Sequence, residues 1–157
     1  GPKIIGVNRK GEAVDGCSKV ITVEKIDSIL SEADILYLAM PETPETKNLI
    51  SRKRLDLLKP SCGIVNIGRQ STLDYEALCE KLRANKIAGA ILDVFTPEPI
   101  ELNSKLWEIP NLIITPHVSS DDGESYVRLT LELFTKNLKL FISNKPLINQ
   151  VNKNLGY

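Results

Sequence analysis

Three apolar runs in the second half of the chain each end at a residue capable of chemistry. The run SCGIVNIGR ends at Arg69, IAGAILD ends at Asp93 and NLIITPH ends at His117, the only histidine. The three side chains are spaced 24 residues apart, about the length of one strand-plus-helix unit. In an open α/β sheet, ligands bind beyond the carboxyl ends of the strands. The spacing therefore predicts a parallel sheet with a cation, a carboxylate and an imidazole at one edge.

Composition narrows the class of ligand. The 157 residues include 20 basic and 20 acidic side chains, and this balance gives no electrostatic reason to expect nucleic acid or an anionic membrane as a partner. No apolar stretch reaches the roughly 20 residues that span a bilayer. The three cysteines are widely spaced, without a CxxC pair or a histidine cluster, which predicts neither a disulfide framework nor a metal site. We expect a cytoplasmic protein that binds a small molecule.

Hydrophobic periodicity predicts alternating strands and helices. Strands are expected at 3–7, 19–23, 34–39, 63–67, 87–94 and 112–115, and helices at 24–32, 51–58, 74–85 and 124–142. The strand at 87–94 is rich in Ala and Ile, which is typical of burial on both faces. The helix at 124–142 has apolar residues three and four positions apart, a pattern that predicts one buried stripe.

Four segments resemble motifs of the D-isomer-specific 2-hydroxyacid dehydrogenases, a family that includes glyoxylate and hydroxypyruvate reductases. VNIGR at 65–69 resembles the arginine motif, LDVFTPEP at 92–99 the acidic motif and TPHVSS at 115–120 the histidine motif. The segment at 40–43 stands where the family has its Pro-x-Thr cofactor loop. The resemblance covers nearly the whole chain but about half of a full-length member. It implies an NAD(P)-dependent oxidoreductase that reduces 2-oxo acids to D-2-hydroxyacids by hydride transfer.

The glycine-rich turn G-x-G-x-x-G of dinucleotide-binding domains does not occur in this sequence. The expected fold is therefore an incomplete Rossmann-like, three-layer α/β fold whose parallel sheet lacks the first βα unit. Residues 1–120 would form a partial dinucleotide-binding domain, and 121–157 a helix and tail that pack on an absent substrate domain. In the strand order 3-2-1-4-5-6, the absent strand lies between the second and the fourth. We expect little activity from the chain alone, and a homo-oligomer because strand edges recruit partners.

The resemblance assigns three catalytic residues. Arg69 would bind the substrate carboxylate, since a guanidinium donates two parallel hydrogen bonds to such a group. His117 would donate a proton to the ketone oxygen during reduction and accept one during oxidation. Glu98 would orient the imidazole and stabilise its charged form. The competing interpretations are a surface arginine at a strand end, a structural histidine and an exposed loop acid.

The resemblance also implies a cofactor site. Asp93 would contact the nicotinamide carboxamide, or would instead cap a turn. Asn8, Arg9 and Lys10 follow a strand whose end usually determines cofactor choice; no acid is present for a ribose hydroxyl, so NADP is favoured over NAD. A solvated basic turn is the competing interpretation. The remaining expected contacts are Met40, Pro41, Thr43, Ile67, Gly68, Arg69, His117 and Ser119. A non-catalytic Rossmann-like binding or interaction module is the alternative function.

Overall fold

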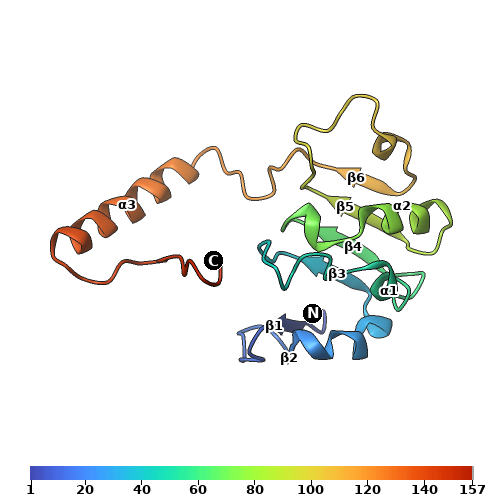
Figure 1. The fold of residues 1–157 in the computed structure, drawn as a ribbon, viewed down its shortest axis with the longest axis horizontal. Coiled ribbons are helices and arrows are strands. Elements are labelled where there is room, and N and C mark those ends of the chain that lie inside the picture. Colours follow the sequence, from blue (N-terminus) through green and yellow to red (C-terminus); the bar gives the residue numbers. More distant parts are fainter. Residues whose placement is uncertain (157) are drawn as a thin grey trace.

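The computed structural model describes residues 1–156 and contains parallel strands, most of them connected through helices (Figure 1). The strands are β1 (Ile5–Asn8), β2 (Lys19–Thr22), β3 (Ile35–Leu38), β4 (Gly63–Asn66), β5 (Gly89–Leu92) and β6 (Leu112–Ile114). The α-helices are α1 (Arg52–Leu55), α2 (Tyr75–Arg83) and α3 (Tyr126–Ile142). Short 3-10 helices are η1 (Val23–Ser28), η2 (Leu30–Glu32), η3 (Gln70–Thr72) and η4 (Lys105–Glu108). The Rossmann-like parallel α/β class is confirmed.

The strands form two separate sheets. One has the order β1-β2 and the other the order β3-β4-β5-β6, and every pair is parallel. Among the described residues, no strand connects β1 to β3, and the two sheets lie apart in Figure 1. The break falls where the sequence predicts an unfilled strand position. The carboxyl ends of β3 to β6 lie at one edge, because parallel strands in register all point the same way.

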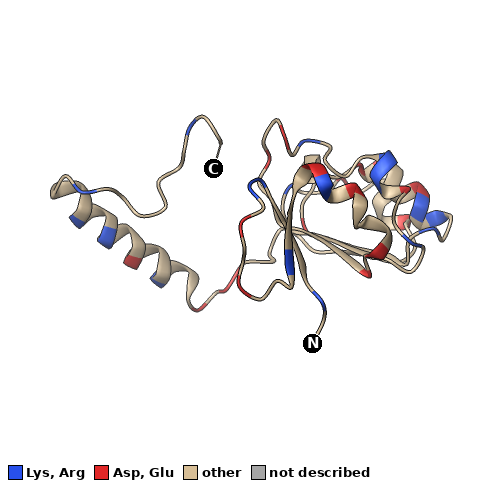
Figure 2. Ribbon diagram, turned by 90° about the horizontal axis from the view of Figure 1, so that it is seen from below, with Lys and Arg blue, Asp and Glu red and all other residues tan. Residues whose placement is uncertain are grey.

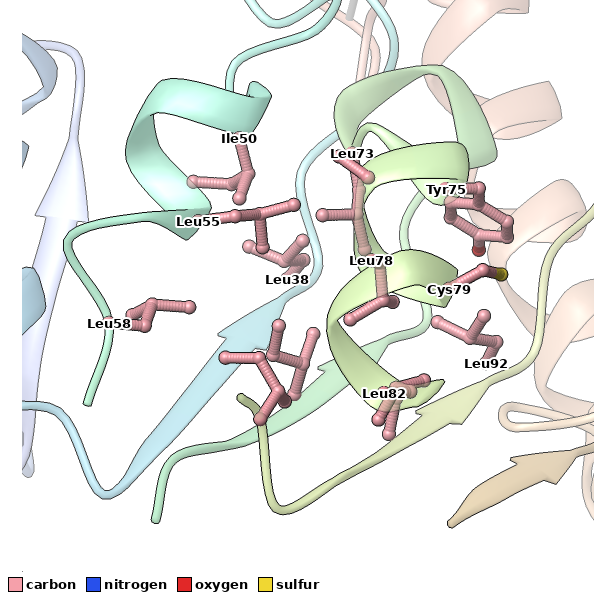
Figure 3. Packing of buried hydrophobic residues seen from close by; sticks show 14 of the residues in the cluster. Leu38, Ile50, Leu55, Leu58, Leu73, Tyr75, Leu78, Cys79, Leu82 and Leu92 are labelled. Atoms are coloured by element: carbon pink, nitrogen blue, oxygen red, sulfur yellow. The ribbon is translucent and has the colours of Figure 1, made fainter. Parts of the chain in front are cut away.

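The core lies between the four-stranded sheet and its helices (Figure 3). Asp74 begins α2 as its N-cap, accepting a hydrogen bond from the Ala77 amide at 2.9 Å. From there Leu78 and Leu82, four residues apart, face the same way and are fully buried. The other members of the cluster that Figure 3 labels are Leu38, Ile50, Leu55, Leu58, Leu73, Tyr75, Cys79 and Leu92. This packing holds the strand ends in fixed positions.

Two local predictions differ from the structure. The single helix predicted at 24–32 is divided into the two consecutive 3-10 helices η1 and η2, and their apolar residues Ile26 and Leu30 are buried. The strand β5 is buried on one face only: Ala90 and Leu92 are covered while Ile91 is exposed. Ile35 and Tyr37 of β3 and Ile113 of β6 are exposed as well. No helix of the described residues covers this second face.

The prediction of a buried stripe on α3 is also wrong within the described residues. Its apolar residues Val127, Leu131, Phe134, Leu138 and Phe141 have the predicted spacing, but all are exposed. The helix lies away from the sheets, and its charged residues follow one side of it (Figure 2). The helix is amphipathic with an uncovered apolar face. None of the helices in residues 1–156 has the combined length and apolar character needed to cross a membrane.

Candidate active site

The end of β4 brings its loop against the loop that follows β3. Asn66 is fully buried, and its amide oxygen accepts a hydrogen bond from the Gly68 amide at 3.0 Å while its nitrogen donates to the Arg69 carbonyl at 3.2 Å. Gly68 lies so close to Met40 that an added Cβ would stand 2.6 Å from the Met40 carbonyl oxygen. Only glycine allows this approach of the two backbones. Arg69, the next residue, is exposed and extended beyond the strand.

Glu98 and His117 form a hydrogen-bonded pair. The Nδ1 atom of His117 lies 2.8 Å from Oε2 of Glu98, and Oε1 accepts a hydrogen bond from the Phe95 amide at 2.7 Å. The hydrogen bond from His117 lowers the pKa of Glu98, with further contributions from the Phe95 amide and the charge of Arg69. Both side chains remain accessible to solvent, at 45% for His117 and 36% for Glu98. The pair therefore presents the other ring nitrogen of His117 for proton transfer.

The turn that carries His117 is held by Asp93. His117 has a φ of 58°, in the left-handed region that disfavours residues other than glycine by roughly 1–2 kcal/mol. Oδ1 of Asp93 accepts hydrogen bonds from the Thr115 hydroxyl at 2.5 Å and the Val118 amide at 3.0 Å, and Oδ2 accepts one from the Ser119 amide at 3.0 Å. Burial raises the pKa of Asp93, but these bonds outweigh it and lower the pKa to about 2. Asp93 is therefore ionised at neutral pH.

Tyr75 contacts the segment that leads from β5 to Glu98. Its hydroxyl donates to the Val94 carbonyl at 2.7 Å and accepts from the Asn66 amide at 3.3 Å. Its ring meets Phe95 edge to face, with 6.1 Å between centroids, an arrangement that favours aromatic pairs. Burial raises the pKa of the Tyr75 hydroxyl. Sequence reasoning missed Tyr75 because nothing in α2 marks one aromatic residue as a support for a distant loop.

The end of β1 carries the predicted basic turn. The Asn8 side chain holds the turn itself, because Oδ1 accepts from the Lys10 and Gly11 amides at 3.1 and 2.6 Å. Lys10 pairs with Glu12 at 3.3 Å, and Arg9 is exposed. The Asn8 side chain therefore stabilises the turn.

The loop after β3 forms a turn closed by two threonines. The Thr43 amide donates to the Thr46 hydroxyl at 2.7 Å, and the same hydroxyl donates to the Pro41 carbonyl at 2.7 Å. Hydrogen bonds from its own backbone and from the Thr43 hydroxyl lower the pKa of Glu45, and the charge of Arg9 also acts on it. The Arg9 turn and this loop therefore lie near enough to interact electrostatically, across the break between the two sheets.

The structure thus brings the predicted residues together in two groups. Glu98 and His117 are hydrogen-bonded beyond β5 and β6, and the charge of Arg69, which follows β4, acts on Glu98. Arg9 and the loop after β3 lie on either side of the break. Thr115 and Asn66 were not predicted to take part. A signal for Asn66 existed, because an amide within an apolar strand must find buried partners, whereas the link from Thr115 to Asp93 depends on the register of two strands.

These elements define an α/β dinucleotide-binding domain of the Rossmann type, with a cation and a carboxylate–imidazole pair at the carboxyl edge of the sheet. Residues 1–119 match the family model described as the NAD binding domain of D-isomer specific 2-hydroxyacid dehydrogenases. The chain belongs to this family, as the sequence motifs predicted.

Relatives of known sequence agree with the family. The chain is 35% identical over 155 residues to an uncharacterized protein from Corynebacterium melassecola, covering 99% of this chain and 51% of that protein. It is 42% identical over 100 residues to a glyoxylate/hydroxypyruvate reductase B from Pectobacterium carotovorum, covering 64% of this chain and 31% of the relative. The chain thus spans about half the length, or less, of these relatives.

Solved structures of this family are similar in fold. A D-isomer specific 2-hydroxyacid dehydrogenase from Xanthobacter autotrophicus, in complex with NADPH and MES, matches with a TM-score of 0.90 at 31% identity over 99% of this chain and 63% of that chain. An NADPH-dependent glyoxylate/hydroxypyruvate reductase from Sinorhizobium meliloti, in complex with NADP and sulfate, has a TM-score of 0.88 at 29% identity over 99% of this chain and 49% of that chain.

Proposed function

We propose that this chain carries the acid–base and substrate-binding groups of an NAD(P)-dependent oxidoreductase that reduces a small 2-oxo acid to a D-2-hydroxyacid. The observation that supports it most directly is the 2.8 Å pair of His117 and Glu98, with the charge of Arg69 acting on the same carboxylate. Arg69 binds the substrate carboxylate, and His117 donates a proton to the ketone oxygen. Glu98 holds Nδ1, so that Nε2 faces the substrate.

The residues at the sheet edge fit a dinucleotide. Gly68 keeps the backbones of the two loops within contact distance of each other, and an exposed cation stands at the end of β1. We assign Met40, Pro41, Thr43, Ile67, Gly68 and Ser119 to the walls of the cofactor site, near the catalytic group. When bound, the cofactor supplies the hydride that goes to the carbonyl carbon. The chain's own residues supply the proton and the carboxylate contact.

The test is an assay of the complete gene product that contains these residues, with NADPH or NADH and glyoxylate or hydroxypyruvate. His117→Ala is expected to lower kcat/KM by about 10²–10⁴, because it removes the proton donor. Arg69→Ala is expected to lower kcat/KM by a similar factor, because it removes a charged partner of the substrate. A wild-type product that binds the cofactor without turnover would instead support a non-catalytic binding module.

We infer that NADP is the preferred cofactor. Residues 8–11 at the end of β1 include no acid, and Arg9 is an exposed cation of this turn whose charge reaches the loop after β3, so we assign Arg9 to a 2′-phosphate. The similar structures named above contain NADPH and NADP. Arg9→Asp is expected to weaken NADPH binding at least tenfold more than NADH binding, because it replaces a cation with a like charge. Titration of nicotinamide fluorescence measures this ratio, and an unchanged ratio would contradict the assignment.

We further propose a cytoplasmic homo-oligomer. All three cysteines are free, and the two buried ones have thiols whose pKa is raised by burial, which is consistent with a reducing compartment. The exposed apolar face of the four-stranded sheet and the apolar stripe of α3 provide surfaces for association.

A further inference from the structure

We propose that Tyr75 is a positioning residue whose hydroxyl holds the peptide group to which Glu98 is bonded. This role rests on the proposed function of His117 as the proton donor, because Glu98 acts on the reaction through the imidazole. The hydroxyl donates a hydrogen bond to the Val94 carbonyl at 2.7 Å, and the Phe95 amide donates one to Oε1 of Glu98 at 2.7 Å. This carbonyl and this amide belong to one planar peptide group. Tyr75 therefore fixes one end of the group, and the other end binds Glu98.

The hydrogen bonds continue beyond both ends of this peptide group. On one side, the Asn66 side chain donates to the Tyr75 oxygen at 3.3 Å and to the Arg69 carbonyl at 3.2 Å. On the other side, Oε2 of Glu98 lies 2.8 Å from Nδ1 of His117. Consecutive hydrogen bonds polarise one another, so a carbonyl that accepts a bond makes the amide of its own peptide group a stronger donor. Tyr75 thus connects the loop of the arginine with the carboxylate–imidazole pair.

Tyr75 is fixed in the core, whereas the loop that it binds borders a cavity. Its side chain is buried among the residues of Figure 3, with the ring edge to face against Phe95. Burial raises the pKa of the hydroxyl, which therefore stays protonated as a donor. A cavity of about 230 Å³ lies beside the ring, and Thr96 and Pro97 of the loop are part of its lining. Because packing is incomplete on that side, the loop depends more on the hydrogen bonds of its first peptide group.

Tyr75→Phe removes the hydroxyl and keeps the ring, so it tests the hydrogen bond without opening the core. NMR of this chain is expected to show amide hydrogen exchange about three- to tenfold faster at Phe95, as for the weakening of one hydrogen bond. The hydrogen bonds from His117 and from the Phe95 amide lower the pKa of Glu98. The variant should therefore raise this pKa, which a carboxyl ¹³C titration measures. If exchange and titration both matched the wild type, the proposal would be overturned.

Tyr37→Phe is the matched control, because it removes the same hydroxyl from an exposed tyrosine of β3. It should leave the exchange of the Phe95 amide and the titration of Glu98 unchanged. Changes of equal size in the two variants would show that the effect does not come from the Tyr75 bond, and would contradict the proposal.

Kinetics of the complete gene product separate positioning from general support of the fold. In Tyr75→Phe, Asn66 keeps its bonds to the Gly68 amide and the Arg69 carbonyl, so the arginine loop should stay in place. The KM for glyoxylate and the Kd for NADPH should therefore remain within about twofold, while kcat falls about tenfold because the imidazole is displaced. A lower melting temperature with an unchanged kcat would mean that Tyr75 only stabilises the fold, and the positioning role would be wrong.

A double variant tests whether Tyr75 acts through Glu98. If it does, adding Tyr75→Phe to Glu98→Ala should change kcat by less than about twofold, because the carboxylate that the peptide group holds is already absent. A further loss of about tenfold would show that Tyr75 acts by another route and would overturn the proposal. An inactive wild type would contradict the proposed function. The exchange of the Phe95 amide and the titration of Glu98 would then still decide whether Tyr75 holds the carboxylate.

Discussion

At the scale of single residues, Gly68 is where the two loops of the site come closest. Because Gly68 has no side chain, the Met40 carbonyl oxygen can lie only 2.6 Å from the position that a Cβ would occupy. Both partners are backbone, so neither can move aside by changing rotamer. Gly68 therefore keeps the arginine of the site and the loop after β3 together.

Gly68→Ala is expected to lower the free energy of unfolding by about 1–3 kcal/mol, because the added methyl group forces the two backbones apart. Urea denaturation measures the change. Gly63→Ala is the control: a Cβ at that position of β4 meets nothing within 4 Å, so its stability should be unchanged or slightly raised. Equal losses in both variants would show that the close approach at Gly68 is absent in solution.

At the scale of elements, α2 and α3 differ although both are amphipathic. The apolar face of α2 enters the core through Leu78 and Leu82, while that of α3 is exposed. Periodicity identifies the face of a helix that seeks burial. Periodicity does not specify which surface covers that face.

We expect truncation of a leucine side chain to affect stability differently in the two helices. Leu78→Ala should lower the free energy of unfolding by about 2–5 kcal/mol, because it opens a cavity in a closed core. Leu131→Ala removes the same atoms from an exposed position. It should change the free energy of unfolding by no more than about 0.5 kcal/mol. Thermal or urea denaturation at low protein concentration makes the comparison. A loss above about 2 kcal/mol for Leu131→Ala would mean that α3 packs against something in solution.

At the scale of the whole molecule, the dominant feature is the break between the two sheets. The outer edge of β3 has no strand beside it among the described residues, and Ile35 and Tyr37 on this strand are 67% and 57% exposed. Unpaired backbone groups and apolar side chains together favour association.

We expect the chain to associate as its concentration rises, which light scattering over a concentration series measures. Tyr37→Lys should reduce the association, because a charge on an edge strand opposes pairing. Leu102→Lys, at a loop residue that is 98% exposed, should have no such effect. A monomer at every concentration would contradict the expected homo-oligomer.

Much of the site was predictable because the strand ends fix it. An apolar run that ends at a polar residue predicts both the strand and the edge at which that residue lies, so Arg69, Asp93 and His117 were placed by spacing alone. Glu98 depended on the resemblance, since nothing local brings a loop acid to an imidazole. Tyr75 and Thr115 were missed because their partners are 19 and 22 residues away.

The sequence by itself determined the class of fold, the order of the strands along the chain and the chemistry at their ends, because these follow from hydrophobic period and residue type. Only the tertiary structure decided which partners within the chain the Asp93 carboxylate has and which apolar faces are covered. The register of β5 against β6 brings this carboxylate to Thr115, Val118 and Ser119, which lie 22, 25 and 26 residues further along the chain. The burial of an apolar face depends on which element packs against it, and the sequence of a single segment does not specify that element.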